Sequence, residues 1–164
     1  MTELGRWKGD RVIELYNKLW AVVAERKGIS LDEALTTHEV RQIWSEDFDR
    51  GAEMYYQLVW DSQLEPLDFS MTPITKFEIV GFYGWHQGNV RPGAIEYLKV
   101  FIENTKIREY PGIFLDSELN DIFIFPDPFY AFKTQRLSIV PHLRQPGPAG
   151  YVRCFPLGFA IKAR

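Results

Sequence analysis

The sequence predicts an α+β protein: an N-terminal helical segment followed by an antiparallel β-sandwich, jelly-roll-like or barrel domain. Two observations lead to this class. Apolar residues recur at three- and four-residue steps over the first sixty residues, which is typical of amphipathic helices. After residue 75 the chain changes to short β-branched and aromatic runs separated by turn signals. We expect two to four helices in residues 1–62, a linker over 63–75 and the β domain over 76–164.

The first helix is expected over residues 10–27. Asp10 can cap its start, and Gly28 stands where a helix commonly ends. The apolar residues of this segment form one stripe, which needs a partner surface: Val12, Leu15, Tyr16, Leu19, Trp20 and Val23.

Two capping-box patterns follow, at residues 30–33 (SLDE) and 36–39 (TTHE). The first predicts a short helix that runs through Leu35. The second predicts a further helix, because apolar residues keep the helical spacing to about Trp60. Residues 61–75 then lose all periodicity and contain two prolines, which is typical of a linker.

The remaining chain is expected to form strands that pair antiparallel. Its apolar runs are short and closely spaced, so there is no room for the long crossovers of a parallel sheet. Residues 94–106 also fit a helical step, but their Val, Ile, Phe and Tyr content favours a strand. The expected turns read GNVRPG, ENTK, YPG, DSELND, FPDP and RQPGPAG.

Composition indicates a folded protein of one domain, or of one domain with a small appendage. The chain has 164 residues, of which 46% are hydrophobic and 25% charged. Aromatic residues make up 15%, an excess that indicates a large core, an interface or both. Cys154 is the single cysteine, and its apolar neighbours predict a buried, structural thiol. Neither a signal peptide nor a membrane span is apparent, which predicts synthesis in the cytoplasm.

The sequence contains no motif for catalysis, metal binding or a cofactor. The three histidines lie far apart and outside any known metal-binding spacing. Phosphate-binding glycine loops and the nucleophile-elbow pattern are absent. The acidic turn at residues 116–121 lacks the pattern of a calcium loop and is interpreted as solvated. We therefore expect no catalytic residues, no metal site and no cofactor.

Residues 82–93, FYGWHQGNVRPG, concentrate polar and aromatic side chains in one short stretch. Its glycines and proline predict a long loop between two strands. Such a loop could be a plain turn, or it could present side chains to a partner. A catalytic histidine would need an orienting partner, and the sequence identifies none. The candidate interface residues are Trp85, His86, Gln87, Asn89 and Arg91.

Charge is distributed unevenly along the chain. Residues 1–70 hold 8 basic and 14 acidic residues, whereas residues 71–164 hold 11 and 8. Segments of opposite charge attract each other, either within one chain or between copies. The segment after Asp127 contains no acid, and its basic residues are Lys133, Arg136, Arg144, Arg153, Lys162 and Arg164.

These features lead to three hypotheses. The first is a non-enzymatic structural protein that contacts copies of itself or other assembly proteins, most concretely a phage virion component such as a capsid, cement or tail protein. The second is a small-ligand-binding protein or enzyme that uses the mouth of the β domain, with Trp85, His86 and Arg91 at its rim. The third is nucleic-acid binding by the basic C-terminal segment, which is disfavoured because strand alternation would bury its aromatic residues.

Overall fold

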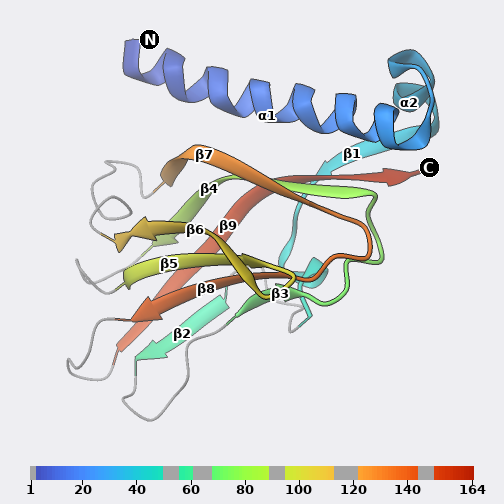
Figure 1. The fold of residues 1–164 in the computed structure, drawn as a ribbon. Coiled ribbons are helices and arrows are strands. Elements are labelled where there is room, and N and C mark those ends of the chain that lie inside the picture. The colour runs from blue at the N-terminus through green and yellow to red at the C-terminus, as the bar shows by residue number, and fades with distance from the viewer. Residues whose placement is uncertain (1–2, 50–55, 61–67, 89–94, 113–121, 144–149) are drawn as a thin grey trace.

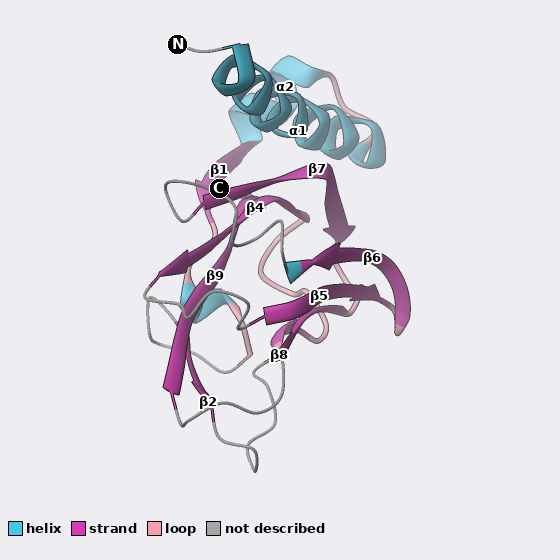
Figure 2. Ribbon diagram, turned by 90° about the vertical axis from the view of Figure 1, so that its left-hand side faces the viewer, coloured by secondary structure: helices cyan, strands magenta, loops and turns pink. Residues whose placement is uncertain are grey.

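The computed structural model describes residues 3–49, 56–60, 68–88, 95–112, 122–143 and 150–164. Two helices come first: α1 (Glu3–Lys27) and α2 (Leu31–Thr37). The strands that follow form two antiparallel sheets in a sandwich, and α1 lies across the outer face of one of them (Figure 1). Figure 2 shows both helices on the same side of this sandwich. The expected class, an N-terminal helix followed by an antiparallel β-sandwich, is confirmed.

The two sheets have different sizes and strand orders. The five-stranded sheet A has the order β1 (His38–Gln42), β9 (Gly150–Ala163), β4 (Ile79–Gly88), β7 (Ile122–Phe132), and β2 (Tyr56–Trp60) also pairs with β9. The four-stranded sheet B has the order β3 (Phe69–Met71), β8 (Leu137–Leu143), β5 (Ile95–Ile102), β6 (Thr105–Pro111). Both sheets therefore combine strands from before and after residue 76.

Two hydrophobic clusters separate the protein into three layers. The larger cluster lies between the sheets and includes Phe69, Phe82 and Trp85, none of which has exposed area. The smaller cluster lies between α1 and sheet A, where Leu19 packs with Ile79 and other side chains of the sheet. Full burial of each such side chain contributes about 1.5–3 kcal/mol to folding.

Helix α1 follows the predicted apolar stripe, but it begins seven residues before the expected cap at Asp10. It ends as predicted at Gly28, whose φ of 65° is the left-handed conformation that glycine favours. The short helix α2 begins as predicted, since the Ser30 hydroxyl accepts a hydrogen bond from the Glu33 amide at 3.1 Å. In the part of the chain that the structure describes, these are the two α-helices, and a 3-10 turn at Ser45–Asp47 follows β1.

The helix expected from residue 36 to about Trp60 is wrong. Residues His38–Gln42 form β1 and residues Tyr56–Trp60 form β2, and both pair antiparallel with β9. The capping-box pattern at residues 36–39 is used differently, because the Thr37 hydroxyl closes the end of α2 by bonding the Glu33 carbonyl at 2.8 Å. A local pattern of a few residues is overridden here by long-range pairing with a central strand.

Part of the expected linker is also a strand. Residues Phe69–Met71 form β3, which pairs with β8, and Phe69 is completely buried between the sheets. The preference for a strand in residues 94–106 is confirmed, because β5 and β6 form a hairpin. Its turn has positive φ at both Glu103 and Asn104, as the ENTK signal predicts for a tight hairpin.

The FPDP signal does not end a strand. Strand β7 continues through it. Its pairing with β4 shifts register there, from Phe82 opposite Phe129 to Gly84 opposite Ile124. Residues 113–121, which hold most of the expected GIFL strand and the acidic turn, lie outside the described residues. No helix in the described ranges is long and apolar enough to cross a membrane.

Candidate functional site

The stretch 82–88 is the end of the central strand β4, so the expectation of a loop there is wrong. Strand β4 is hydrogen-bonded to β7 on one side and to β9 on the other. Its glycines allow close backbone approach: a Cβ on Gly84 would lie 2.7 Å from the Phe123 carbonyl oxygen. Glycine in a strand can mark such a close backbone contact, whereas the sequence interpretation took these glycines as turn signals.

The candidate interface residues in this stretch are mostly core residues. Trp85 has no exposed area, and its indole Nε1 donates a hydrogen bond to Gln87 Oε1 at 3.2 Å. Gln87 is 4% exposed. His86 lies between Trp85 and Gln87, so it faces the other side of the sheet, and it is partly buried. Trp85 and Gln87 are therefore too deeply buried to anchor a partner in the folded protein. Asn89 and Arg91 lie outside the described residues.

Several residues of the basic C-terminal segment are neutralised within the chain. Lys162 forms an ion pair with Glu39 at 3.1 Å, and Lys133 pairs with Glu78 at 3.3 Å. The Arg164 guanidinium donates a hydrogen bond to the His38 carbonyl at 3.2 Å. The Lys162–Glu39 pair joins the two oppositely charged segments within one chain, whereas Lys133 and Glu78 both belong to the later segment.

The structure shows no cluster of positive charge among the described side chains of the other basic residues. Arg136 is exposed, and its backbone amide donates to Glu103 at 3.0 Å. Arg144 lies outside the described residues, and of Arg153 the structure describes the backbone in β9 alone.

Two further expectations concern metal and thiol chemistry. Among the described residues, no group of three His, Cys, Asp or Glu side chains could hold a metal ion. Cys154 is fully buried, and this burial raises the pKa of its thiol well above the ordinary value. The thiol is therefore protonated at neutral pH and is a poor nucleophile.

The outer face of sheet B differs from that of sheet A because no described helix covers it (Figures 1 and 2). The strand register shows which residues lie side by side across this sheet. Tyr97 lies opposite His142, and Lys99 lies between Val140 and Glu109. Residues opposite each other in antiparallel strands share one face. Tyr97 is 39% exposed, which makes it one of the most exposed large apolar side chains of the described strands.

This face combines an aromatic ring with charged groups. The Lys99 ammonium lies 5.6 Å from the centre of the Tyr97 ring and 4.0 Å from the Glu109 carboxylate. Burial lowers the pKa of His142, and the nearby Lys99 charge lowers it further. His142 is therefore neutral at pH 7, and the face has one aromatic ring, one imidazole and one paired lysine available for contact.

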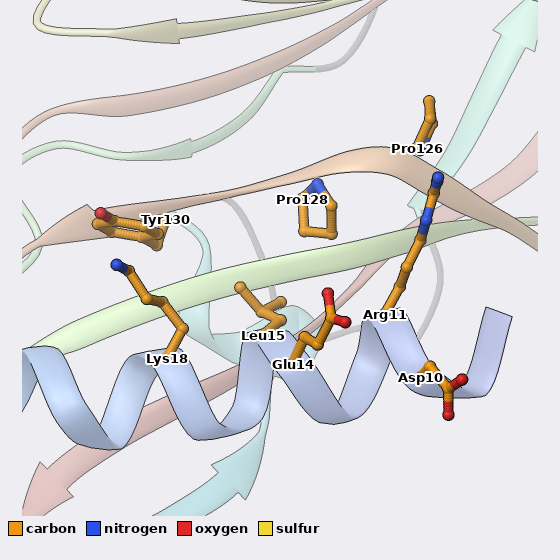
Figure 3. Close-up of a pocket in the computed structure, with 8 residues that line it drawn as sticks. All are labelled: Asp10, Arg11, Glu14, Leu15, Lys18, Pro126, Pro128 and Tyr130. Atoms are coloured by element: carbon orange, nitrogen blue, oxygen red, sulfur yellow. The ribbon is translucent and has the colours of Figure 1, made fainter. Parts of the chain in front are cut away.

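A second surface feature is a groove of about 590 Å³ between α1 and β7 (Figure 3). Helix α1 contributes a row of charged residues on one wall, Asp10, Arg11, Glu14 and Lys18, and Leu15 at the base. Strand β7 contributes the opposite wall, formed by Pro126, Pro128 and Tyr130. Sequence reasoning missed this groove, because it depends on how α1 crosses the irregular part of β7.

Comparison with known proteins identifies no family. No protein family matches the chain, and no curated protein matches it. A solved structure to which it is similar is described as "Carbohydrate-Binding Module CBM36 in complex with calcium and xylotriose". The two are 7% identical with a TM-score of 0.33, over 74% of this chain and 99% of that chain. A likeness at this level carries no functional argument for the present protein.

Proposed function

We propose that this protein is a non-enzymatic assembly protein that acts through protein–protein contacts. The observation that carries this proposal is the outer face of sheet B, which no described helix covers (Figures 1 and 2) and which exposes Tyr97 of β5. The partners are copies of the same chain or other assembly proteins. The most concrete role is that of a phage virion component such as a capsid, cement or tail protein, made in the cytoplasm and incorporated into the virion.

The chemistry of this face supports contact with another polypeptide. Tyrosine is enriched at protein interfaces, because it offers a large rigid surface with one polar end. Lys99 and Glu109 are 29% and 36% exposed, so they can exchange partners at the polar rim of an interface. A jelly-roll arrangement of the sandwich belongs to the same proposal, since viral capsid domains commonly use jelly rolls.

The test is the mass of the protein in solution, measured by light scattering over a range of concentrations. We expect an oligomer, and we expect Tyr97→Ala to dissociate it. The matched control is Leu31→Ala, because Leu31 is 50% exposed on α2, at the opposite side of the sandwich. The control should keep the oligomer.

Two results would reject the proposal. One is a monodisperse monomer at high concentration that also captures no other assembly protein. The other is equal dissociation by Tyr97→Ala and Leu31→Ala, since that would place the contact elsewhere. Mass spectrometry of purified particles would test the virion role separately.

A further inference from the structure

The groove between α1 and β7 has walls that are held in place by specific bonds. On the β7 side, the Tyr110 hydroxyl donates to the Asp127 carbonyl at 3.0 Å. Arg108 also binds Asp127, with its Nε 2.8 Å from the carboxylate. On the α1 side, Arg11 donates to the Phe125 carbonyl at 3.4 Å. The irregular part of β7 is thus bonded to neighbouring elements on both flanks.

Two unpaired charges of the groove face β7, whereas Asp10, which is also unpaired among the described residues, points away from it in Figure 3. Glu14 and Lys18 are four residues apart on α1, a spacing and order that favour an ion pair on a helix. Within the part of the chain that the structure describes, neither side chain makes an ion pair or hydrogen bond. Figure 3 shows Glu14 reaching toward Pro128 and Lys18 toward Tyr130, so both point at β7.

The remaining lining of the groove is largely apolar. Pro128 has no backbone N–H, and Tyr130 presents an aromatic ring that can also attract an ammonium group. The charged wall is balanced, with two acidic and two basic side chains, and one of the basic ones, Arg11, already bonds the backbone of β7. A ligand with a single charge would leave one of the two unpartnered groups unsatisfied.

We propose that this groove binds a small zwitterionic molecule with an apolar body. Its ammonium group binds the Glu14 carboxylate, and its carboxylate binds the Lys18 ammonium. Its apolar body lies against Pro128 and Tyr130. The volume of about 590 Å³ falls within the range of small-ligand sites. This site is on the opposite side of sheet A from sheet B, so the inference is independent of the assembly role.

The first experiment measures binding by isothermal titration calorimetry with ε-aminocaproate as the zwitterion. Hexylamine and caproate, which carry one charge each, serve as matched ligands at the same pH and ionic strength. We expect ε-aminocaproate to bind about tenfold more tightly than either, because it adds a second charge-assisted hydrogen bond. Glu14→Gln and Lys18→Gln should each remove this advantage, whereas Glu25→Gln, on α1 but outside the groove, should keep it.

The second experiment reverses one charge at a time. With Lys18→Glu the groove should prefer hexamethylenediamine, and with Glu14→Lys it should prefer adipate. Both side chains are exposed, and the melting temperature of each variant confirms folding. The inference is overturned if ε-aminocaproate does not bind the unaltered protein, or binds no more tightly than the singly charged ligands. It is also overturned if Glu25→Gln weakens binding as much as Glu14→Gln, or if neither reversal changes the preferred ligand.

Discussion

Gly81 and Gly84 occupy the middle of β4 because larger side chains would collide with neighbouring elements. A Cβ on Gly81 would lie 2.8 Å from Leu19 of α1, and one on Gly84 would meet the Phe123 carbonyl oxygen at 2.7 Å. At these two positions glycine serves close packing. Gly84 was one of the glycines that suggested a loop in the sequence, and that is why Trp85 was taken for a surface residue when it lies in the core.

Glu78 provides a residue-scale prediction. Burial raises the pKa of Glu78, but hydrogen bonds from Lys27 and Lys133, at 3.0 and 3.3 Å, lower it more, to below its ordinary value of 4.5. A lowered pKa means that the carboxylate stabilises the fold above pH 4.5 and that this contribution is lost as the pH falls through the folded-state pKa. Glu78→Gln should therefore lower the free energy of unfolding by about 1 kcal/mol at neutral pH.

Urea denaturation at neutral pH and at a pH below the lowered pKa checks this expectation. The difference between Glu78→Gln and the unaltered protein should shrink toward zero in acid. Glu25→Gln is the matched control, because Glu25 is exposed on α1. An effect of Glu78→Gln that is the same at both pH values would contradict the assignment.

At the scale of elements, strand β7 both pairs with β4 and lines the groove beside α1. Its two halves pair with β4 in different registers, and the residues between them, Pro126 to Pro128, form one wall of the groove. Prolines cannot donate to a ladder, so they are tolerated on an edge strand such as β7. The same prolines keep a further strand from adding to this edge of sheet A.

Tyr110 provides a prediction about how the irregular part of β7 is held in place. Its ring stacks on Phe125 at 4.3 Å, and its hydroxyl bonds the Asp127 carbonyl. Burial raises the pKa of Tyr110, so the hydroxyl stays protonated and keeps donating at alkaline pH. Tyr110→Phe keeps the ring but removes this bond, and should lower the free energy of unfolding by about 1 kcal/mol.

The control for this substitution is Tyr97→Phe, because the Tyr97 hydroxyl makes no hydrogen bond to any described residue and its ring is 39% exposed. Urea denaturation should show a clear shift for Tyr110→Phe and almost none for Tyr97→Phe. Equal shifts in the two variants would show that the bond to Asp127 does not stabilise β7.

At the scale of the whole molecule, the excess of aromatic residues is largely explained by the sandwich core. Phe48, Phe69 and Phe155 form edge-to-face contacts with one another, and Phe82 stacks on Phe129 at 5.4 Å. The long strands β4 and β9 are central, and the edge strands β1, β2 and β3 are short, which limits edge-to-edge pairing with other chains. Contacts between molecules are thus expected through faces rather than through strand edges.

The charge of the whole molecule yields a prediction about nucleic acid. The formal net charge is −3, and Lys133 and Lys162 of the basic segment are paired with acids. We expect no measurable binding of single- or double-stranded DNA in fluorescence anisotropy near physiological ionic strength, since phosphate binding needs unpaired cations. Affinity that falls steeply with added salt would contradict this expectation.

The sequence predicted some elements well because the cause lies within a few residues. The stripe from Leu15 to Val23, the cap at Ser30 and the stop at Gly28 are local features, and all are present in the structure. Strands β1 and β2 could not be predicted in this way, because their hydrogen bonds go to β9, ninety or more residues away. The groove was beyond prediction for the same reason, since its walls come from α1 and β7.

The sequence by itself determined the order of a helix followed by antiparallel strands, because hydrophobic periodicity and turn residues act over short distances. It also determined that Cys154 is structural, since an apolar run places a thiol in the core. Only the tertiary structure decided that Trp85 is buried, that Glu39 and Lys162 neutralise each other, and that Glu14 and Lys18 stay unpaired in a groove. Burial and charge pairing depend on which distant segments meet, and neither periodicity nor composition specifies that.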